Sequence, residues 1–218
     1  MLKVHTIITG SLSENCYLAE DTDTKECVIV DPGSDKAKII WKIEELGLTP
    51  KAILLTHYHY DHVNAADDVR DEFGIEIYSS EAERDLLQMC YEIQEHPMGR
   101  ESGGVKSDRY LKDGETFSLM NRGWKMILTP GHTKGSCCYL CINDDIMFSG
   151  DTLFHGTYGR TDLYSGDAAQ MRSSLTEKLF KMSDDIKAYP GHGMRTSIGR
   201  EKNINMILFD CTADFRIS

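Results

Sequence analysis

A run of potential metal ligands lies between His57 and His62. Four such side chains, those of His57, His59, Asp61 and His62, fall within six consecutive residues. The apolar, branched segment 52–56 precedes them and is typical of a buried strand. Because side chains alternate along a strand, His57 and His59 are expected to point to the same side. Asp61 and His62 follow a turn and can reach a second position nearby. We interpret the run as the start of two adjacent metal sites rather than as a solvated surface turn.

Three further segments place a ligand next to glycine at the end of an apolar run. Glycine in such a position lets the backbone turn sharply and approach an ion closely. Each segment alone is typical of an ordinary corner between a strand and a loop, but together with the first run they provide seven nitrogen or oxygen ligands. The segments are Pro130-Gly131-His132, Ser149-Gly150-Asp151 and Pro190-Gly191-His192-Gly193.

The order of these motifs resembles that of the metallo-β-lactamase superfamily along the whole chain. Two segments, Gly150-Asp151-Thr152-Leu153-Phe154 and Gly159-Arg160-Thr161-Asp162, are similar to its hydroxyacylglutathione hydrolase (glyoxalase II-like) branch. The resemblance implies an α/β fold, an αββα sandwich of two mixed sheets flanked by helices, with the metals at one edge between the sheets. It also implies a single domain over residues 1–218, as in short single-domain members of that branch.

The resemblance further implies how the ligands are shared between two divalent ions. Zinc is the expected metal, because histidine stands at position 59, where the related flavodiiron proteins carry a glutamate that favours redox iron. Iron and manganese stay open, since both accept mixed nitrogen and oxygen ligands. In this assignment Asp61 and Asp151 are also the catalytic carboxylates. The ligands are His57, His59 and His132 for the first ion, Asp61, His62 and His192 for the second, and Asp151 as the bridge.

The reaction implied is hydrolysis of a thioester. Two divalent ions about 3.5–4 Å apart can share a hydroxide and lower the pKa of its parent water to about 7. That metal-bridging hydroxide would attack the carbonyl carbon, and a thiolate leaves without a general acid because a free thiol has a pKa of about 8.5. The expected enzyme is a binuclear metallohydrolase similar to hydroxyacylglutathione hydrolase. Its expected substrate is hydroxyacyl-glutathione or a related low-molecular-weight thiol ester.

Other activities of the same fold stay open. A mononuclear-iron sulfur (persulfide) dioxygenase would hold one iron through the residues that match His57, His132 and Asp151. Metal analysis separates that enzyme, with one iron, from a hydrolase with two metals. A lactone or phosphodiester hydrolase would use the binuclear site on a different substrate. A metal-binding scaffold without catalysis is disfavoured by the complete ligand set.

The residues that contact substrate are less well defined than the ligands. Two-domain glyoxalase II enzymes bind glutathione largely through a helical C-terminal extension, which is not expected here because the sequence ends soon after Leu208. Those enzymes carry a lysine nine residues after the bridging aspartate, where this chain has Arg160, and a tyrosine two residues past the last histidine ligand, where it has Met194. Arg160 could bind a substrate carboxylate or form an internal ion pair with Asp162. Tyr158 is a candidate wall of the substrate pocket.

Composition limits the other possibilities. The chain has 218 residues, of which 40% are hydrophobic, enough for one sizeable core. No segment is apolar for long enough to span a bilayer, and the first residues lack a signal sequence, so we expect a cytoplasmic protein without membrane partners. The net charge of −11 disfavours binding to nucleic acid. The expected partner is a small-molecule thioester, and the oligomeric state stays open.

The seven cysteines are expected to be reduced thiols of the core. Cys138 and Cys141 form a CxxC spacing, which is found in zinc and redox sites. No second pair stands nearby, so a zinc or redox role is the weaker alternative.

Alternating strand and helix patterns must position these motifs. Ser80 is the expected cap of one helix, and Gly47 and Gly74 are the expected ends of two others. Asp31 follows the first predicted strand and either orients a histidine ligand or only begins a turn before Pro32. Strands are predicted over 27–30, 52–56, 76–78, 125–129, 137–143 and 145–149, helices over 39–46, 63–73, 80–90, 168–182 and 197–208, and a loop over 96–108.

Overall fold

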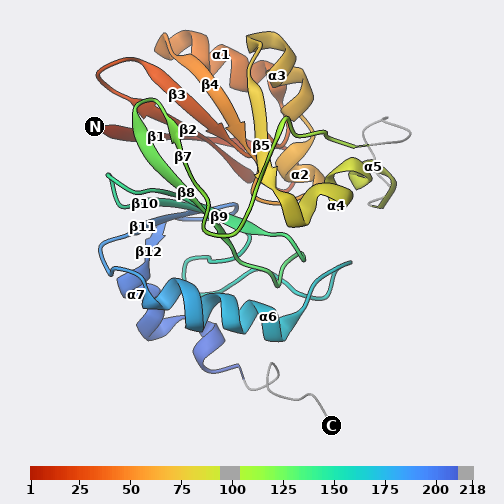
Figure 1. Cartoon of the computed structure of the whole chain (residues 1–218), viewed down its shortest axis with the longest axis vertical. Coiled ribbons are helices and arrows are strands. Elements are labelled where there is room, and N and C mark those ends of the chain that lie inside the picture. The colour runs from red at the N-terminus through yellow and green to blue at the C-terminus, as the bar shows by residue number, and fades with distance from the viewer. Residues whose placement is uncertain (94–103, 211–218) are drawn as a thin grey trace.

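Two mixed β-sheets lie face to face, and helices cover the outer face of each sheet (Figure 1). The computed structural model describes residues 1–93 and 104–210, and each sheet in it has six strands. The first sheet and its helices come from the N-terminal part of the chain, and the second sheet and its helices come from the C-terminal part. This arrangement confirms the αββα sandwich predicted from the sequence.

The first sheet begins antiparallel and continues parallel. Across the sheet its strands are β1 (Leu2–Thr9), β2 (Glu14–Asp21), β3 (Glu26–Val30), β4 (Thr49–Leu54), β5 (Glu76–Ser80) and β6 (Arg109–Leu111). β1, β2 and β3 pair antiparallel, whereas β3, β4, β5 and β6 pair parallel. Parallel neighbours need crossover connections. The connections run through α1 (Lys36–Leu46), α2 (Tyr60–Val63), α3 (Ala66–Phe73), η1 (Glu81–Glu83), α4 (Arg84–Gln88) and α5 (Cys90–Ile93).

The second sheet is mostly antiparallel. Its strands are β7 (Thr116–Leu119), β8 (Arg122–Leu128), β9 (Cys137–Cys141), β10 (Ile146–Gly150), β11 (Lys187–Pro190) and β12 (Thr196–Ser197), and only β10 and β11 pair parallel. The helical segment between those two strands covers the outer face, as Figure 1 shows. It consists of α6 (Ala168–Ser173), η2 (Ser174–Lys178) and η3 (Leu179–Lys181), and α7 (Ile198–Ile204) with η4 (Met206–Leu208) follows β12.

Apolar side chains form three layers that match this architecture. Between the sheets, Trp124 and Phe148 stack with ring centroids 6.2 Å apart. Above the first sheet, Ile39 and Ile43 of α1 belong to the buried outer layer, as the helical spacing predicted. Below the second sheet, the outer layer includes Met171, Leu175, Leu179 and Ile198. Burial of apolar surface on both faces of both sheets fixes their relative position and therefore the edge where the ligands meet.

Several predicted helices are real but less regular than expected. The cap at Ser80 is confirmed, since its side chain accepts a hydrogen bond from the backbone of Ala82, and left-handed glycines end α1 and α3. The predicted helix over 80–90 is divided into η1, α4 and α5. The helix over 168–182 keeps a helical path to Lys181, but it changes from α to π and then to 3₁₀ geometry.

Two helix predictions were wrong about continuity, and a hydrogen bond accompanies each break. The segment 63–73 is not one helix, because Val63 ends α2 and the N–H of Ala65 bonds to the carbonyl of Pro32 at 3.0 Å. The segment 197–208 breaks at Asn205, whose extended backbone lets its side chain accept from the N–H of Ile207. Only residues 104–108 of the predicted loop are described, and they form neither helix nor strand; residues 96–103 lie outside the described ranges.

The CxxC cysteines do not form a common site. Cys138 belongs to the layer below the second sheet, whereas Cys141 belongs to the layer between the sheets. Within residues 1–93 and 104–210, all the cysteines are buried and free. The prediction of reduced core thiols therefore holds for the cysteines in these ranges, and the zinc or redox alternative has no geometry to support it.

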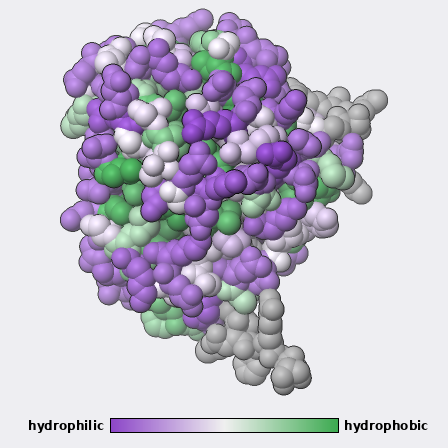
Figure 2. All heavy atoms as spheres, viewed as in Figure 1, coloured by the Kyte–Doolittle hydropathy of each residue, from purple (hydrophilic) through white to green (hydrophobic). Residues whose placement is uncertain are grey.

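The surface is predominantly hydrophilic on the face seen in Figure 2, where hydrophobic areas are small and scattered. None of the helices in the described part of the chain combines the length and the apolar composition needed to cross a membrane.

Candidate metal centre

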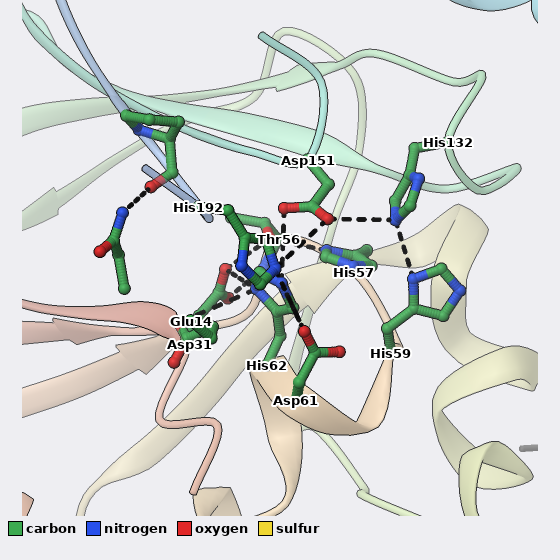
Figure 3. A network of polar contacts seen from close by, with 12 residues as sticks. Glu14, Asp31, Thr56, His57, His59, Asp61, His62, His132, Asp151 and His192 are labelled. Atoms are coloured by element: carbon green, nitrogen blue, oxygen red, sulfur yellow. Dashed lines mark hydrogen bonds and ion pairs between the residues drawn. The ribbon is translucent and has the colours of Figure 1, made fainter. Parts of the chain in front are cut away.

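The predicted ligands converge at one edge of the sandwich, where the ends of four strands meet (Figure 3). His57 and His59 follow β4 of the first sheet, and Asp61 and His62 lie on the short helix α2. The other three follow strands of the second sheet: His132 after β8, Asp151 after β10 and His192 after β11. The centre is therefore assembled from both sheets, and neither sheet could form it alone.

The first group of side chains contains only histidines. One nitrogen each from His57, His59 and His132 lies within 4.8 Å of the others. Nδ1 of His59 is 2.8 Å from Nε2 of His132, and the three side chains are buried. Such close imidazole nitrogens can face one divalent cation together.

The second group adds a carboxylate. Oδ2 of Asp61 lies 3.2 Å from Nε2 of His192 and 3.7 Å from Nε2 of His62. These three ligand atoms also lie within 4.8 Å of one another. The group can therefore hold a second cation, adjacent to the first.

Asp151 lies between the two groups. Its Oδ2 atom is 3.5 Å from Nε2 of His132, a member of the first group. The same oxygen is 3.7 Å from Nε2 of His192, and Oδ1 is 3.4 Å from Nε2 of His62, both members of the second group. This is the position that a bridging carboxylate would need, and Figure 3 shows the side chain directed into the centre.

Several buried polar atoms fit the presence of cations. Nε2 of His57, Nε2 of His62 and Oδ1 of Asp151 are buried and lack a hydrogen-bond partner among the described residues. A buried polar atom left unpaired costs about 1–3 kcal/mol. Three such atoms facing one another are costly in an empty site and are compensated when a cation binds them. The donor set of imidazole and carboxylate suits zinc, iron or manganese.

Burial keeps the first group neutral. Desolvation lowers the pKa of His57 well below its ordinary value and lowers the pKa of His59 to about 3. Desolvation also lowers the pKa of His132, against the opposite effect of Asp151. These imidazoles therefore keep a free lone pair at neutral pH, which is the form that binds a metal.

In the second group the pKa values of the histidines are raised rather than lowered. Burial alone would lower the pKa of His62, but the carboxylates of Asp151, Asp61 and Asp31 raise it well above its ordinary value. Burial would likewise lower the pKa of His192, but its hydrogen bond with Asp61 is the main cause that raises it. The pKa of Asp61 is lowered because His62 and His192 outweigh its desolvation. The excess of carboxylate over imidazole favours a positive charge here, either protons or a cation.

Two glycines allow the ligands to approach one another. A Cβ atom on Gly191 would lie 2.2 Å from Oδ1 of Asp151 and 2.5 Å from Cε1 of His62, so any side chain would occupy the centre. Gly150 has a φ of +46° and lies against Thr56, where a Cβ atom would meet Oγ1 at 2.4 Å. These contacts give a steric reason for the glycine beside a ligand noted in the sequence.

Asp31 contacts the candidate ligand His62 and is therefore more than a turn residue before Pro32. Its Oδ2 atom is 2.9 Å from Nδ1 of His62 and accepts the hydroxyl of Thr56 at 2.6 Å. Its Oδ1 atom accepts the backbone N–H of Thr56 at 2.8 Å. A proton on Nδ1 of His62 leaves Nε2 free to face the centre.

Arg160 contributes through its backbone. Its carbonyl oxygen accepts a hydrogen bond from Nδ1 of His132 at 2.7 Å, which directs Nε2 of that histidine into the centre. Its guanidinium pairs with both carboxylate oxygens of Asp162, each at 2.7 Å. The side chains are 61% and 68% exposed, so the pair exists but is not internal as expected.

Sequence reasoning missed two buried glutamates near the centre. Oε1 of Glu83 accepts the N–H of Tyr58 at 3.0 Å and the hydroxyl of Thr133 at 2.7 Å, so it joins the loops that carry the first group. Glu14 accepts the hydroxyl of Thr9 at 2.6 Å, and its other oxygen lies 4.0 Å from Nδ1 of His62. Local sequence gave no signal for either residue, because the contacts that bring them to the centre, with Tyr58 and Thr133 for Glu83 and with His62 for Glu14, are distant along the chain.

A cavity of about 570 Å³ opens onto the centre. Tyr158 lines it, and its hydroxyl is held by the carboxylate of Asp210. Arg160 also lines the cavity. The remaining walls that are not ligands are mainly apolar or aromatic: Leu12, Tyr60, Phe154, Thr157 and Leu163.

Comparisons with known proteins agree with this geometry. A profile of the metallo-beta-lactamase superfamily matches residues 9–192, a span that includes all seven candidate ligands. Hydroxyacylglutathione hydrolase GloC of Haemophilus influenzae is 36% identical over 209 residues, which cover 95% of this chain and 98% of that relative.

Two solved structures are similar in both sequence and fold. The crystal structure of BLEG-1 B3 metallo-beta-lactamase has a TM-score of 0.87 and 35% identity, covering 95% of this chain and 100% of that one. The crystal structure of TTHA1623 in a di-iron-bound form has a TM-score of 0.78 and 30% identity, covering 92% of this chain and 98% of that one.

Proposed function

The chain belongs to the metallo-beta-lactamase superfamily, and from that premise we propose that it is a binuclear hydrolase of thioesters formed by small thiols. The observation that carries the proposal is the position of Asp151, within 3.4–3.7 Å of histidines from both ligand groups, at the base of a cavity. The similarity to hydroxyacylglutathione hydrolase GloC supports the choice of substrate class.

In this proposal each group of side chains holds one divalent ion, with zinc as the metal. His57, His59 and His132 would hold the first ion, Asp61, His62 and His192 would hold the second, and Asp151 lies where it could serve both. When bound, two such ions would lower the pKa of a water and would polarise the carbonyl group of an ester.

The surrounding residues keep that centre in place. Asp31 holds the Nδ1 proton of His62, and the carbonyl of Arg160 holds the Nδ1 proton of His132, so both histidines present Nε2. Phe154 packs edge-on against His192, with ring centroids 6.2 Å apart, and together with Leu163 offers an apolar surface to the acyl group.

The cavity is poor in groups that could protonate a leaving group. Apart from the ligands, the titratable side chains that line it within the described residues are Tyr60, Tyr158 and Arg160. Burial raises the pKa of Tyr60, and burial together with Asp210 raises the pKa of Tyr158 to about 12. Such groups are weak acids at neutral pH. This supports a substrate whose leaving group departs without a proton, as a thiolate does and an amine does not.

The test is a panel of matched substrates on protein of known metal content. One acyl group is presented as a thioester, an oxygen ester and an amide, beside a lactone, a β-lactam and a persulfide. We expect turnover of the thioester to exceed that of the amide and the β-lactam by orders of magnitude. A β-lactam is included because of the similarity to BLEG-1. Oxygen consumption with a persulfide and one iron per chain would instead favour the dioxygenase and overturn the proposal.

A further inference from the structure

A second cavity, of about 490 Å³, adjoins the first. The same two chain segments, 154–155 and 192–193, contribute residues to both cavities. Phe154 and His192 line the first cavity, and the residues that follow them directly, His155 and Gly193, line the second. To enter the second cavity, a substrate that extends beyond the reacting carbonyl would pass these segments.

The second cavity is lined by basic but not by acidic side chains, although the chain carries a net charge of −11. The basic residues are Arg195 and His155. Thr6 and Tyr189 add hydroxyl groups, and Met194 and Ile8 are among the apolar residues. In an acidic protein, a cavity lined by basic side chains and by no carboxylate presents a local site for an anion.

Arg195 and Arg160 differ in whether the guanidinium already binds a carboxylate of the described residues. Across residues 1–93 and 104–210, Arg195 makes no ion pair or side-chain hydrogen bond. Arg160, the arginine of the first cavity, is already bound to both oxygens of Asp162 at 2.7 Å. A substrate carboxylate would have to displace Asp162 to reach Arg160, whereas it can pair with Arg195 without breaking an existing contact.

The backbone that carries Arg195 is held firmly. Asn15 donates from its side chain to the carbonyls of Pro190 and Gly193, each at 2.9 Å, and the hydroxyl of Tyr17 donates to Pro190 at 2.6 Å. On the other side, Thr196 begins β12, which pairs with β11. A rigid loop of this kind presents its guanidinium to the cavity at a smaller entropic cost than a mobile one.

We propose that the second cavity binds a carboxylate of the thiol half of the substrate, and that Arg195 rather than Arg160 recognises it. The inference rests on the proposed thioesterase function and adds the chemical class of the thiol, which is an anionic one. The acyl group occupies the first cavity, the thioester carbonyl lies over the ligand centre, and the thiol carrier passes Gly193 into the second cavity. The paired guanidinium and carboxylate form charge-assisted hydrogen bonds.

The test uses two thioethers that cannot be hydrolysed, one with a carboxylate on its thiol half and one with a neutral amide at the same position. Their binding to the metal-loaded full chain is measured by calorimetry for the natural sequence, Arg195→Ala, Arg195→Lys and the matched control Arg160→Ala. We expect the carboxylate to bind about tenfold to a hundredfold more tightly to the natural sequence, the range for a hydrogen bond to a charged group. Arg195→Ala should abolish that preference, Arg195→Lys should restore part of it, and Arg160→Ala should retain it.

Each other outcome has a defined meaning. A preference that survives Arg195→Ala, or that disappears in Arg160→Ala alone, overturns the assignment to Arg195. Equal binding of the two thioethers to the natural sequence overturns the anion site. Binding needs no turnover, so a chain that prefers the carboxylate through Arg195 but hydrolyses no thioester would refute the proposed reaction and not the anion site.

Discussion

Oδ2 of Asp31 lies 2.9 Å from Nδ1 of His62, and the two residues come from different strand connections of the first sheet. Through this contact a residue outside the ligand set fixes which nitrogen of His62 faces the centre. The same oxygen accepts the hydroxyl of Thr56 at 2.6 Å, so three segments of the chain are joined at one carboxylate.

We predict that Asp31→Asn weakens metal binding about tenfold to a hundredfold, the usual cost of losing a partner that orients a ligand. The asparagine can accept from Thr56 but stabilises the Nδ1 proton of His62 less than a carboxylate does. Competition with a chelator measures the affinity. Asp23→Asn, at an exposed carboxylate, is the matched control. An affinity equal to that of the control would show that Asp31 is only a turn residue.

The metal stoichiometry should be two ions per chain, because Asp61 and His192 lie 3.2 Å apart and have no role in a one-metal centre. Elemental analysis after saturation and desalting is the measurement. Asp61→Ala should lose one ion, whereas His5→Ala, at a histidine paired with Glu20 away from the centre, should lose none. A plateau at one ion that Asp61→Ala leaves unchanged would contradict the two-metal centre.

Asp151→Ala should reduce turnover at least about 10²-fold while the fold is retained. Asp151 is the carboxylate shared by the two groups, so its loss removes the contacts to His62, His132 and His192 together. Steady-state kinetics and metal content are measured on the same sample, with Asp185→Ala as a surface control. Near-normal rates at full metal content would exclude the bridging role.

Arg160→Ala should leave the melting temperature within about 2 °C of that of the natural sequence, because an exposed ion pair contributes little to stability. The hydrogen bond to His132 comes from the backbone carbonyl and survives the substitution. Gly159→Ala provides the contrast, since its Cβ atom would lie 1.8 Å from the carbonyl oxygen of Asp151. A large loss of stability in Arg160→Ala would revive the internal ion pair expected from the sequence.

Glu83 should make stability depend on pH. Burial raises its pKa to about 7, above the value of about 4.3 in an unfolded chain. Between these values the folded chain keeps a proton that the unfolded chain has lost, so this stabilisation is complete below about pH 4.3 and is lost as the pH rises through about 7.

The measurement is the melting temperature from pH 5 to 8 in the presence of a chelator, which removes the pH dependence of metal binding. Glu83→Gln cannot titrate and should show a smaller decline over that range than the natural sequence. Glu81→Gln, half-exposed on the same turn, is the matched control and should behave like the natural sequence. Parallel curves for Glu83→Gln and the natural sequence would show that Glu83 does not titrate there.

The sequence by itself determined the identity of the candidate ligands and their place at strand ends. This was possible because the signal is local: His57 and His59 follow an apolar strand directly, and Gly150 and Gly191 stand beside Asp151 and His192. The αββα sandwich followed from the resemblance that these motifs carry, and the structure confirms it. The metal roles of these side chains stay predictions, to be tested by the stoichiometry experiment.

Tertiary structure alone decided which groups support the centre. Glu83 meets Thr133, 50 residues away, and His132 meets the carbonyl of Arg160, 28 residues away. Tertiary structure also places Arg160 in an ion pair with Asp162 at the surface. Arg195, in contrast, lines a cavity and pairs with no carboxylate of the described residues. No periodicity or motif reports such contacts, because they are set by how two sheets pack and not by the conformation of either segment. Local patterns specify which residues can bind a metal, and packing specifies which neighbours orient them.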